Sequence, residues 1–292
     1  MSVRTQRTLR QSIESNGVGL FTGADVRLRF CPAADDHGIV FQRIDKPGSP
    51  RIPARIEFVA PGHRRTVITH DGVHVEMIEH VMAALAGLQI DNCVIEIDGP
   101  EVPGFDGSCQ TLCDDLLAAG IVEQSRPRES LSLQMPVLVT GEDEEIDVTA
   151  RPMNHHGLAI TYSLDYGDRS PIPPQNLTVE ITPETFARDI AFARTFVLES
   201  EVAMLKAAGY GQRITHQDLL VFNNDGQIID NELRAPDECV RHKILDCLGD
   251  FSLLGMDLNG YVNAYRSGHR HNHELARRIM VTHQCSQRSE AS

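Results

Sequence analysis

The feature that most constrains this chain is a change of hydrophobic period that occurs twice along it. Val26, Leu28 and Phe30 alternate with arginines, and an apolar segment follows at 39–41, which is typical of strands. From about residue 75 apolar residues instead recur every three or four positions, which predicts a helix at 76–87. The second half repeats this order of strands and then helices. We therefore expect an α+β fold made of two similar halves.

The remaining segments follow the same two periods. In the first half we expect a buried strand at 93–97 and a helix at 110–120. In the second half we expect strands at 132–140, 145–150, 158–164 and 260–268, and helices at 200–208, 238–254 and 274–281. The polar, proline-containing segment 122–130 interrupts both periods, and we interpret it as a linker. This interpretation gives an N-terminal α+β domain at 1–126 and a C-terminal α+β domain at 127–292.

Charge and cysteine content narrow the class of protein. The 292-residue chain has a formal net charge of −14, which repels a phosphate backbone, so we expect no nucleic-acid partner. No apolar run reaches the roughly 18 residues of a membrane span, and the N-terminus lacks the apolar stretch of a secretory signal. The seven cysteines form no C-x-x-C pair and lie mostly in apolar runs, as buried thiols do in a reducing compartment. We expect a cytoplasmic monomer.

The helix at 238–254 has a polar stripe of unusual composition. His242, Asp246 and Asp250 recur every four residues and therefore span roughly 80° of one helix face, with apolar residues behind them. A histidine and an aspartate one turn apart can bind the same metal ion. A solvated helix face, or a buried His–Asp pair without a metal, would produce the same spacing.

The helix at 76–87 contains a second unusual pair. Glu79 and His80 are adjacent in an otherwise apolar stretch, where an unpartnered carboxylate is costly to bury. A Glu–His pair at a solvated helix edge is the alternative. Together the two helices offer two imidazoles and one carboxylate, the three protein ligands of a catalytic zinc, with Glu79 beside them to accept a proton. The H-E-x-x-H pattern of zinc proteases is absent, so this would be a different zinc scaffold.

A third group of candidates follows the last strand. His269 comes directly after Gly268, which leaves room for a ligand, and His269 has the chemistry to protonate a leaving amine. Asp250 is a candidate to orient its ring. His271 and His273 make HRHNH a possible metal-binding tract of its own. We expect instead that these two are exposed residues where the strand gives way to a helix.

Several motifs occur together in the order and approximate spacing of one known family. They are GVGL-x-TG at 17–23, the segment at 78–108, ARTF at 193–196, VRHKILDCLGD at 240–250 and AYRSGH at 264–269. On these residues nearly the whole chain resembles the UDP-3-O-acyl-N-acetylglucosamine deacetylases. These zinc enzymes carry out the committed step of lipid A biosynthesis. The resemblance implies two domains, each a sheet with paired helices, with the helices meeting between the sheets.

The resemblance also implies roles for the site residues. One zinc ion per chain would be bound by His80, His242 and Asp246. Glu79 would be the general base and His269 the general acid, with Asp250 behind it.

The residues implied to hold the substrate are different ones. Thr195 would help to polarise the carbonyl, Phe196 and Gly268 would line the sugar site, and Lys243 would face the nucleotide diphosphate. An insertion near 197–225 would form the passage for the acyl chain. The substrate would be an acylated nucleotide-sugar, and its place in a lipid pathway makes peripheral membrane contact plausible.

Three departures from the family pattern fall where substrate is held. Phe21 replaces a histidine, Gly104-Phe105 replaces an Ile-Met pair, and 209–222 replaces a Gly-Gly-Ser segment. They leave the acyl-chain length open. They also leave two alternatives: a zinc amidase acting on another N-acylated sugar conjugate, or a non-catalytic sugar-nucleotide-binding homologue.

Overall fold

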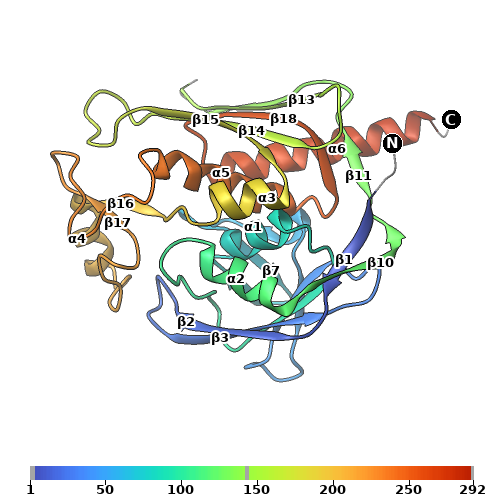
Figure 1. The fold of residues 1–292 in the computed structure, drawn as a ribbon, viewed down its shortest axis with the longest axis horizontal. Coiled ribbons are helices and arrows are strands. Elements are labelled where there is room, and N and C mark those ends of the chain that lie inside the picture. Colours follow the sequence, from blue (N-terminus) through green and yellow to red (C-terminus); the bar gives the residue numbers. More distant parts are fainter. Residues whose placement is uncertain (1–3, 142–144, 291–292) are drawn as a thin grey trace.

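The computed structural model describes residues 4–141 and 145–290 and has two large sheets with helices between them (Figure 1). The lower, five-stranded sheet has the order β2-β3-β9-β4-β5: β2 (Ile13–Val18), β3 (Asp25–Pro32), β9 (Cys93–Ile97), β4 (Ile39–Arg43) and β5 (Arg51–Pro53). In the upper sheet the order is β12-β13-β18-β14-β15: β12 (Val137–Thr140), β13 (Asp147–Arg151), β18 (Asp257–Tyr265), β14 (Leu158–Leu164) and β15 (Gln175–Ile181), with β11 (Ser130–Ser132) beside β18. The predicted α+β class is confirmed.

The two sheets share one local topology. β9 pairs antiparallel with β3 and parallel with β4, while β18 pairs antiparallel with β13 and parallel with β14. Each of these central strands also lies between two helices in the chain: α1 (Glu79–Gly87) and α2 (Gln110–Ala119) flank β9, and α5 (Glu238–Ser252) and α6 (His269–Glu290) flank β18. The two halves are therefore similar, as the repeated hydrophobic pattern predicted.

Small residues let the central helices α1 and α5 approach closely. A Cβ atom added to Gly249 of α5 would lie 2.1 Å from the backbone oxygen of Glu79 in α1. One added to Gly87 would lie 2.2 Å from the ring of Phe186. Because no side chain separates the helices at Gly249, the first turn of α1 lies directly against α5.

Several predicted boundaries are wrong. The strand expected at 132–140 is confined to 137–140 apart from its first residue, and the one expected at 260–268 spans Asp257–Tyr265. Three further predictions differ more. The helix expected at 76–87 begins at Glu79, because β8 (Val73–Glu76) continues to Glu76 and Met77 has a φ of 64°. The helix expected at 274–281 begins at His269. The expected linker is mostly a strand, β10 (Ile121–Pro127), which pairs antiparallel with β1 (Thr5–Leu9) and so satisfies its backbone groups.

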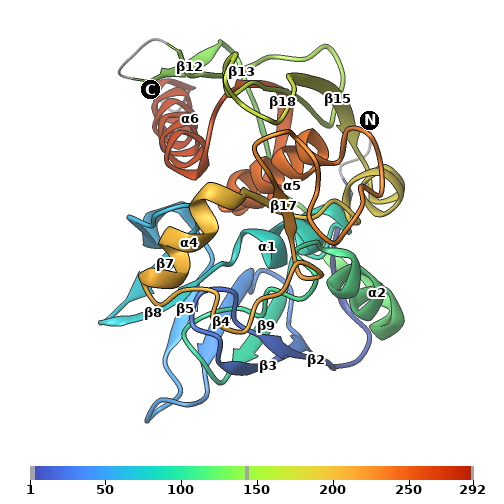
Figure 2. The same ribbon diagram turned by 90° about the vertical axis from the view of Figure 1, so that its left-hand side faces the viewer.

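The expected insertion forms a separate small unit. β16 (Phe196–Leu198) and β17 (Leu220–Phe222) pair in parallel, and α4 (Glu199–Ala207) follows β16. The unit projects at the left of Figure 1, so α4 is toward the viewer in Figure 2. The strand β7 spans Val67–His70. An Arg64–Glu201 ion pair joins α4 to the segment before β7.

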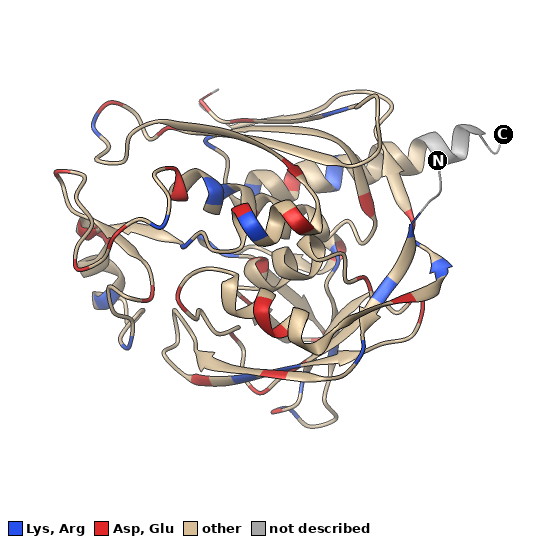
Figure 3. Ribbon diagram, in the orientation of Figure 1, with Lys and Arg blue, Asp and Glu red and all other residues tan. Residues whose placement is uncertain are grey.

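The remaining elements are short. They are β6 (Val59–Ala60), which pairs with β7, and the helical turns η1 (Ile56–Phe58), α3 (Pro183–Thr185) and η2 (Phe186–Ile190). Figure 3 shows acidic and basic residues spread over both halves. No helix within the described residues combines the length and apolarity needed to cross a membrane.

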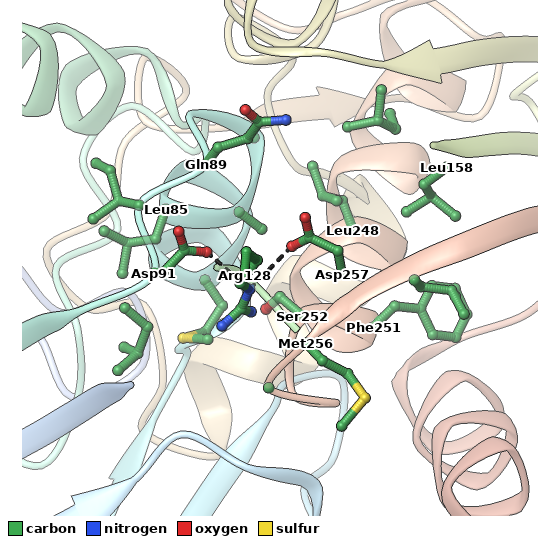
Figure 4. A pocket seen from close by; sticks show the side chains of 18 of the residues that line it. Leu85, Gln89, Asp91, Arg128, Leu158, Leu248, Phe251, Ser252, Met256 and Asp257 are labelled. Carbon is green, nitrogen blue, oxygen red and sulfur yellow. Dashed lines mark hydrogen bonds and ion pairs between the residues drawn. The ribbon is translucent and has the colours of Figure 1, made fainter. Parts of the chain in front are cut away.

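An ion cluster ties the two halves together at the end of the helix pair far from the insertion. Arg128 Nε lies 3.0 Å from Asp91 Oδ1 and 3.1 Å from Asp257 Oδ1. Figure 4 shows Arg128 between these two aspartates, and Arg4 pairs with both of them as well. Beside this cluster is a pocket of about 170 Å³, lined by Leu85 of α1 and Leu248 and Phe251 of α5 among others. None of the site residues predicted from the sequence lines it.

Candidate metal centre and active site

The first turn of α1 carries Glu79 and His80. Both side chains are buried, with residue exposures of 2% and 5%. β8 leads into this turn, and its partner β7 holds the start of the helix in place. The pair therefore lies inside the molecule, and the alternative of a solvated helix edge is excluded by its burial.

The polar face of α5 carries His242, Asp246 and Asp250, all buried. The opposite face contributes Val240, Ile244 and Phe251 to the hydrophobic core, beneath β14 and β15. The alternative of a solvated polar face is thus also excluded. The stripe instead faces α1, across the close contact at Gly249.

The two helices bring His80, His242 and Asp246 together. The Nε2 atom of His242 lies 3.4 Å from Asp246 Oδ1, and that of His80 lies 3.8 Å from the same oxygen. The imidazole rings are 5.1 Å apart and nearly perpendicular, and all three ligand atoms lie within 4.8 Å of one another. A tetrahedral ion with bonds of about 2.0–2.2 Å separates neighbouring ligand atoms by about 3.3–3.6 Å. The spacing fits one metal ion.

The charge states of the three ligands also fit a cation. Burial and the neighbouring His242 lower the pKa of His80 to about 3, and burial lowers that of His242, so both rings are neutral. His242 Nδ1 lies 3.1 Å from the Ala193 carbonyl oxygen and donates to it, which leaves Nε2 as an acceptor. Burial opposes ionisation of Asp246, but Lys243 outweighs it and holds the carboxyl pKa well below its usual range. The acceptor nitrogens of the two imidazoles and the carboxylate oxygen of Asp246 therefore face one another, and a cation bound between them would stabilise this arrangement.

Glu79 and His269 lie next to this site. Glu79 Oε1 is 3.8 Å from His269 Nε2, and His269 Nδ1 is 2.8 Å from Asp250 Oδ2. Burial raises the pKa of Glu79 to about 7. Burial opposes the charge on His269, but Asp250 and Glu79 outweigh it and raise the pKa of this imidazole to about 9. A proton acceptor and a proton donor thus face each other near neutral pH.

Asp250 is held by more partners than the sequence suggested. It accepts hydrogen bonds at 2.7–3.0 Å from four side chains: Thr66, His269, Asn272 and His273. Our expectation that His273 is exposed is wrong, because α6 begins at His269 and places His273 one turn later on the same buried face. Its N···O distance to Asp250 is that of a hydrogen bond, and His271 of the HRHNH tract does not join this group.

The segment 193–196 lies beside the candidate metal ligands. Arg194 is buried and paired with Glu238, the first residue of α5, at 2.8 Å, which anchors the segment. The Thr195 N–H donates to the Gly107 carbonyl at 2.8 Å. The ring centroid of Phe196 is 6.3 Å from that of His242. Thr195 and Phe196 thus follow closely on Ala193, whose carbonyl orients the candidate metal ligand His242.

Lys243 and Gly268 are the remaining residues predicted to line the site, and their surroundings differ from each other. Lys243 Nζ lies 2.8 Å from Asp246 Oδ2, so the ammonium group pairs with the oxygen that does not face the histidines. A Cβ atom added to Gly268 would meet nothing within 4 Å, so open space adjoins it. That space does not depend on the glycine, because alanine would also fit there.

The fold and the site together define an α+β protein with a buried group of two histidines and one aspartate that could hold a metal ion. Residues 6–281 match the family model for UDP-3-O-acyl N-acetylglycosamine deacetylase, and the chain belongs to that family.

Curated relatives agree with the family assignment over nearly the full length. The chain is 39% identical to the UDP-3-O-acyl-N-acetylglucosamine deacetylase of Myxococcus xanthus, over 96% of this chain and 88% of the relative. It is 38% identical to the enzyme of that name from Syntrophotalea carbinolica, over 98% and 91%. It is 36% identical to the one from Bdellovibrio bacteriovorus, over 94% and 89%.

Proposed function

We propose that this protein is a zinc-dependent deacetylase that hydrolyses the acetamide of UDP-3-O-acyl-N-acetylglucosamine, releasing acetate and the free amine. The observation that carries the proposal is the 3.8 Å approach of Glu79 Oε1 and His269 Nε2 beside three converging metal-ligand atoms. Relatives at 36–39% identity carry the name of this activity. In the family, this reaction commits its substrate to lipid A.

His80, His242 and Asp246 hold the metal in this proposal, with one zinc ion per chain. Zinc bound there supplies Lewis-acid chemistry, activating water and polarising the amide carbonyl. The ligand set supports this assignment, since two neutral imidazoles and one carboxylate are typical of catalytic zinc. Lys243 neutralises the second oxygen of Asp246, which favours binding of that carboxylate through Oδ1 alone.

Glu79 is the general base. Its Oε2 atom accepts the Thr66 N–H at 2.9 Å, so Oε1 is free to accept a proton from the attacking water. A buried carboxyl with a pKa near 7 is a better base than an exposed one and is still largely ionised above neutral pH.

His269 is the general acid. Its Nδ1–H donates to Asp250, so Nε2–H points toward Glu79 and the reacting group. When the C–N bond breaks, Nε2–H protonates the departing amine, and Asp250 stabilises the imidazolium before transfer. Thr195 assists by donating a hydrogen bond to the carbonyl oxygen as it gains charge.

Phe196, Gly268 and Lys243 complete the substrate site in this proposal. Phe196 lies near His242, and the open space at Gly268 would take the sugar. Lys243 would provide the cation for the diphosphate of a substrate that the net charge of −14 otherwise repels. The unit at 197–225 would form the acyl passage.

One observation bears on the alternative of a different N-acylated sugar. The three departures from the family pattern lie next to one another: the rings of Phe21 and Tyr210 are 5.3 Å apart, and a Cβ atom at Gly104 would lie 3.2 Å from Leu20. Because these changed residues contact one another, they favour a substrate site that is kept but that holds its ligand through altered contacts. The paired Glu79 and His269 argue against a non-catalytic homologue.

We further propose a boundary between two domains near residues 126 and 127, a monomeric state and a cytoplasmic location with peripheral membrane contact. Sedimentation of the purified protein would test the monomeric state. Its partition between cytosol and membrane fractions at low and high salt would test the cytoplasmic location and the membrane contact.

The direct test is hydrolysis of UDP-3-O-acyl-N-acetylglucosamine with and without a chelator. We expect turnover that the chelator abolishes and that about one equivalent of zinc per chain restores. A competition assay between UDP-3-O-acyl-N-acetylglucosamine and another N-acylated sugar nucleotide measures selectivity. Absence of turnover in the zinc-loaded protein would contradict the proposal, and preference for the other sugar would support the alternative.

A further inference from the structure

We propose that Thr66 is a positioning residue that fixes both proton-transfer groups through separate atoms: its backbone N–H holds Glu79, and its hydroxyl holds the Asp250 behind His269. This inference rests on the proposed function of Glu79 and His269. Thr66 contacts none of the three residues that would bind the metal. In the proposed function it does not contact the substrate either.

The backbone of Thr66 is fixed against the start of α1. Val67 of β7 lies opposite Glu76 of β8, so the residue before Val67 faces the turn that leads into the helix. Thr66 N donates to Glu79 Oε2 at 2.9 Å, and its carbonyl accepts the Ile78 N–H at 3.4 Å. One oxygen of Glu79 is thereby occupied, and the other is directed toward His269.

The hydroxyl of Thr66 reaches the other helix. It donates to Asp250 Oδ1 at 2.7 Å and shares the single Nε2–H of His273, 3.0 Å away, with that same oxygen. It also lies 3.4 Å from His269 Nδ1. A hydroxyl has one hydrogen to donate and two lone pairs, so this oxygen can make both bonds at once. Asp250 Oδ2 is left for His269 Nδ1 at 2.8 Å.

These bonds link the base and the acid through one fully buried residue, with 0% exposure. If the hydroxyl is removed, Asp250 Oδ1 loses its closest donor, and the carboxylate is free to turn toward His273 and Asn272. The His269 ring would turn with it. Glu79 would keep its backbone donor, so the loss should fall on the proton transfer to the amine.

The test compares hydroxyl-free and hydroxyl-retaining variants in the zinc-loaded full chain. We expect Thr66→Val to lower kcat by about 10- to 100-fold, the usual effect of removing a partner that orients a catalytic group. KM should change by less than about twofold, because the hydroxyl makes no substrate contact. Thr66→Ser should restore kcat. Thr66→Ala provides a second hydroxyl-free variant should the valine protein not fold.

Thr161→Val is the matched control. Thr161 is also buried, and its hydroxyl bonds Thr178 at 2.6 Å and Tyr261 at 2.5 Å, in β14 rather than at the site. The same chemical change there should lower the Tm without lowering kcat. A merely structural role for Thr66 would make the two valine variants behave alike.

A readout independent of turnover separates this inference from the proposed function. In ¹⁵N-histidine spectra of the zinc-loaded protein, Thr66→Val should move the His269 imidazole signals, and Thr66→Ser and Thr161→Val should not. If wild-type protein does not hydrolyse the acylated UDP-sugar, the proposed function fails and these spectra still decide the role of Thr66. Unmoved His269 signals, unchanged kcat in Thr66→Val, or loss of its zinc would overturn the inference.

Discussion

The Nε2 atom of His269 lies 3.8 Å from the Oε1 atom of Glu79, although the two residues belong to different halves of the chain. Glu79 opens α1, which precedes the central strand of one sheet, and His269 opens α6, which follows the central strand of the other. The proton acceptor and the proton donor therefore meet only when the halves pack together. Each half alone supplies only part of the site.

The two aspartates one turn apart on α5 should have separable functions. Asp246→Asn should lose zinc, because the amide is a weaker ligand than the carboxylate that faces both histidines. Asp250→Asn is the matched control and should keep zinc while lowering kcat by about 10²-fold or more, since it removes the anion behind the acid. Metal analysis and kinetics of both variants check this. Equal zinc content in the two would contradict the division of roles.

The charge of His269 should depend on Asp250. Its pKa is raised from 6.5 to about 9, so the charged ring contributes stability below about pH 6.5, and that contribution is lost as the pH rises through 9. In metal-free protein at pH 7.5, His269 should be protonated in the wild type and neutral in Asp250→Asn. A pH titration of ¹⁵N-histidine signals, assigned with His269→Gln, measures this. A wild-type midpoint at or below 6.5 would refute the prediction.

Residues within one helix were predictable, because their geometry is local. Four-residue spacing alone places His242 and Asp246 on one face, and the apolar context of Glu79 and His80 marks that pair as unusual. His273 was missed because the helix boundary was misplaced. His273 is four residues after His269, the same spacing that places His242 and Asp246 on one face of α5. A predicted helix beginning at His269 would therefore have placed His273 on the buried face.

Thr66 carries no comparable signal. It is a single threonine before a short strand, and its partner Asp250 is 184 residues away in the chain. Its role depends on β7 pairing with β8, on β8 leading into α1, and on α1 packing against α5. The ion cluster of Arg128 inside the expected linker was hidden for the same reason, since only the tertiary fold brings Asp91 and Asp257 together.

The close contact of the central helices should not tolerate a side chain at Gly249. Gly249→Ala places a Cβ 2.1 Å from the Glu79 backbone oxygen, so the helices must separate. We expect a loss of about 1–3 kcal/mol in the free energy of unfolding, together with weaker zinc binding. Gly268→Ala, which meets nothing within 4 Å, should change stability by no more than about 1 kcal/mol. Urea unfolding compares them, and equal stabilities would count against the proposed helix contact.

The insertion should be held to the first half by aromatic contacts. Tyr210 packs edge-on against Phe21 at 5.3 Å, and the Arg65 guanidinium lies 4.3 Å from the Phe21 ring. An aromatic pair contributes about 0.5–1.5 kcal/mol, so Tyr210→Ala should speed amide exchange in 199–218 by about 2- to 10-fold. KM for the acylated substrate should rise. Met204→Ala, at a 70% exposed residue of α4, is the control and should change neither. Unaltered exchange in Tyr210→Ala would remove the basis for this docking.

X-ray absorption at the zinc edge tests the central claim most directly, because it reports the atoms around the metal. With His80, His242 and Asp246 as ligands, the spectrum should fit about four nitrogen or oxygen neighbours at about 2.0–2.2 Å and no sulfur. His242→Ala should abolish this signal. The chain also contains buried thiols, among them Cys109 and Cys247, so a different site would be detectable. A zinc–sulfur distance of about 2.3 Å, or an unchanged spectrum in His242→Ala, would contradict the account.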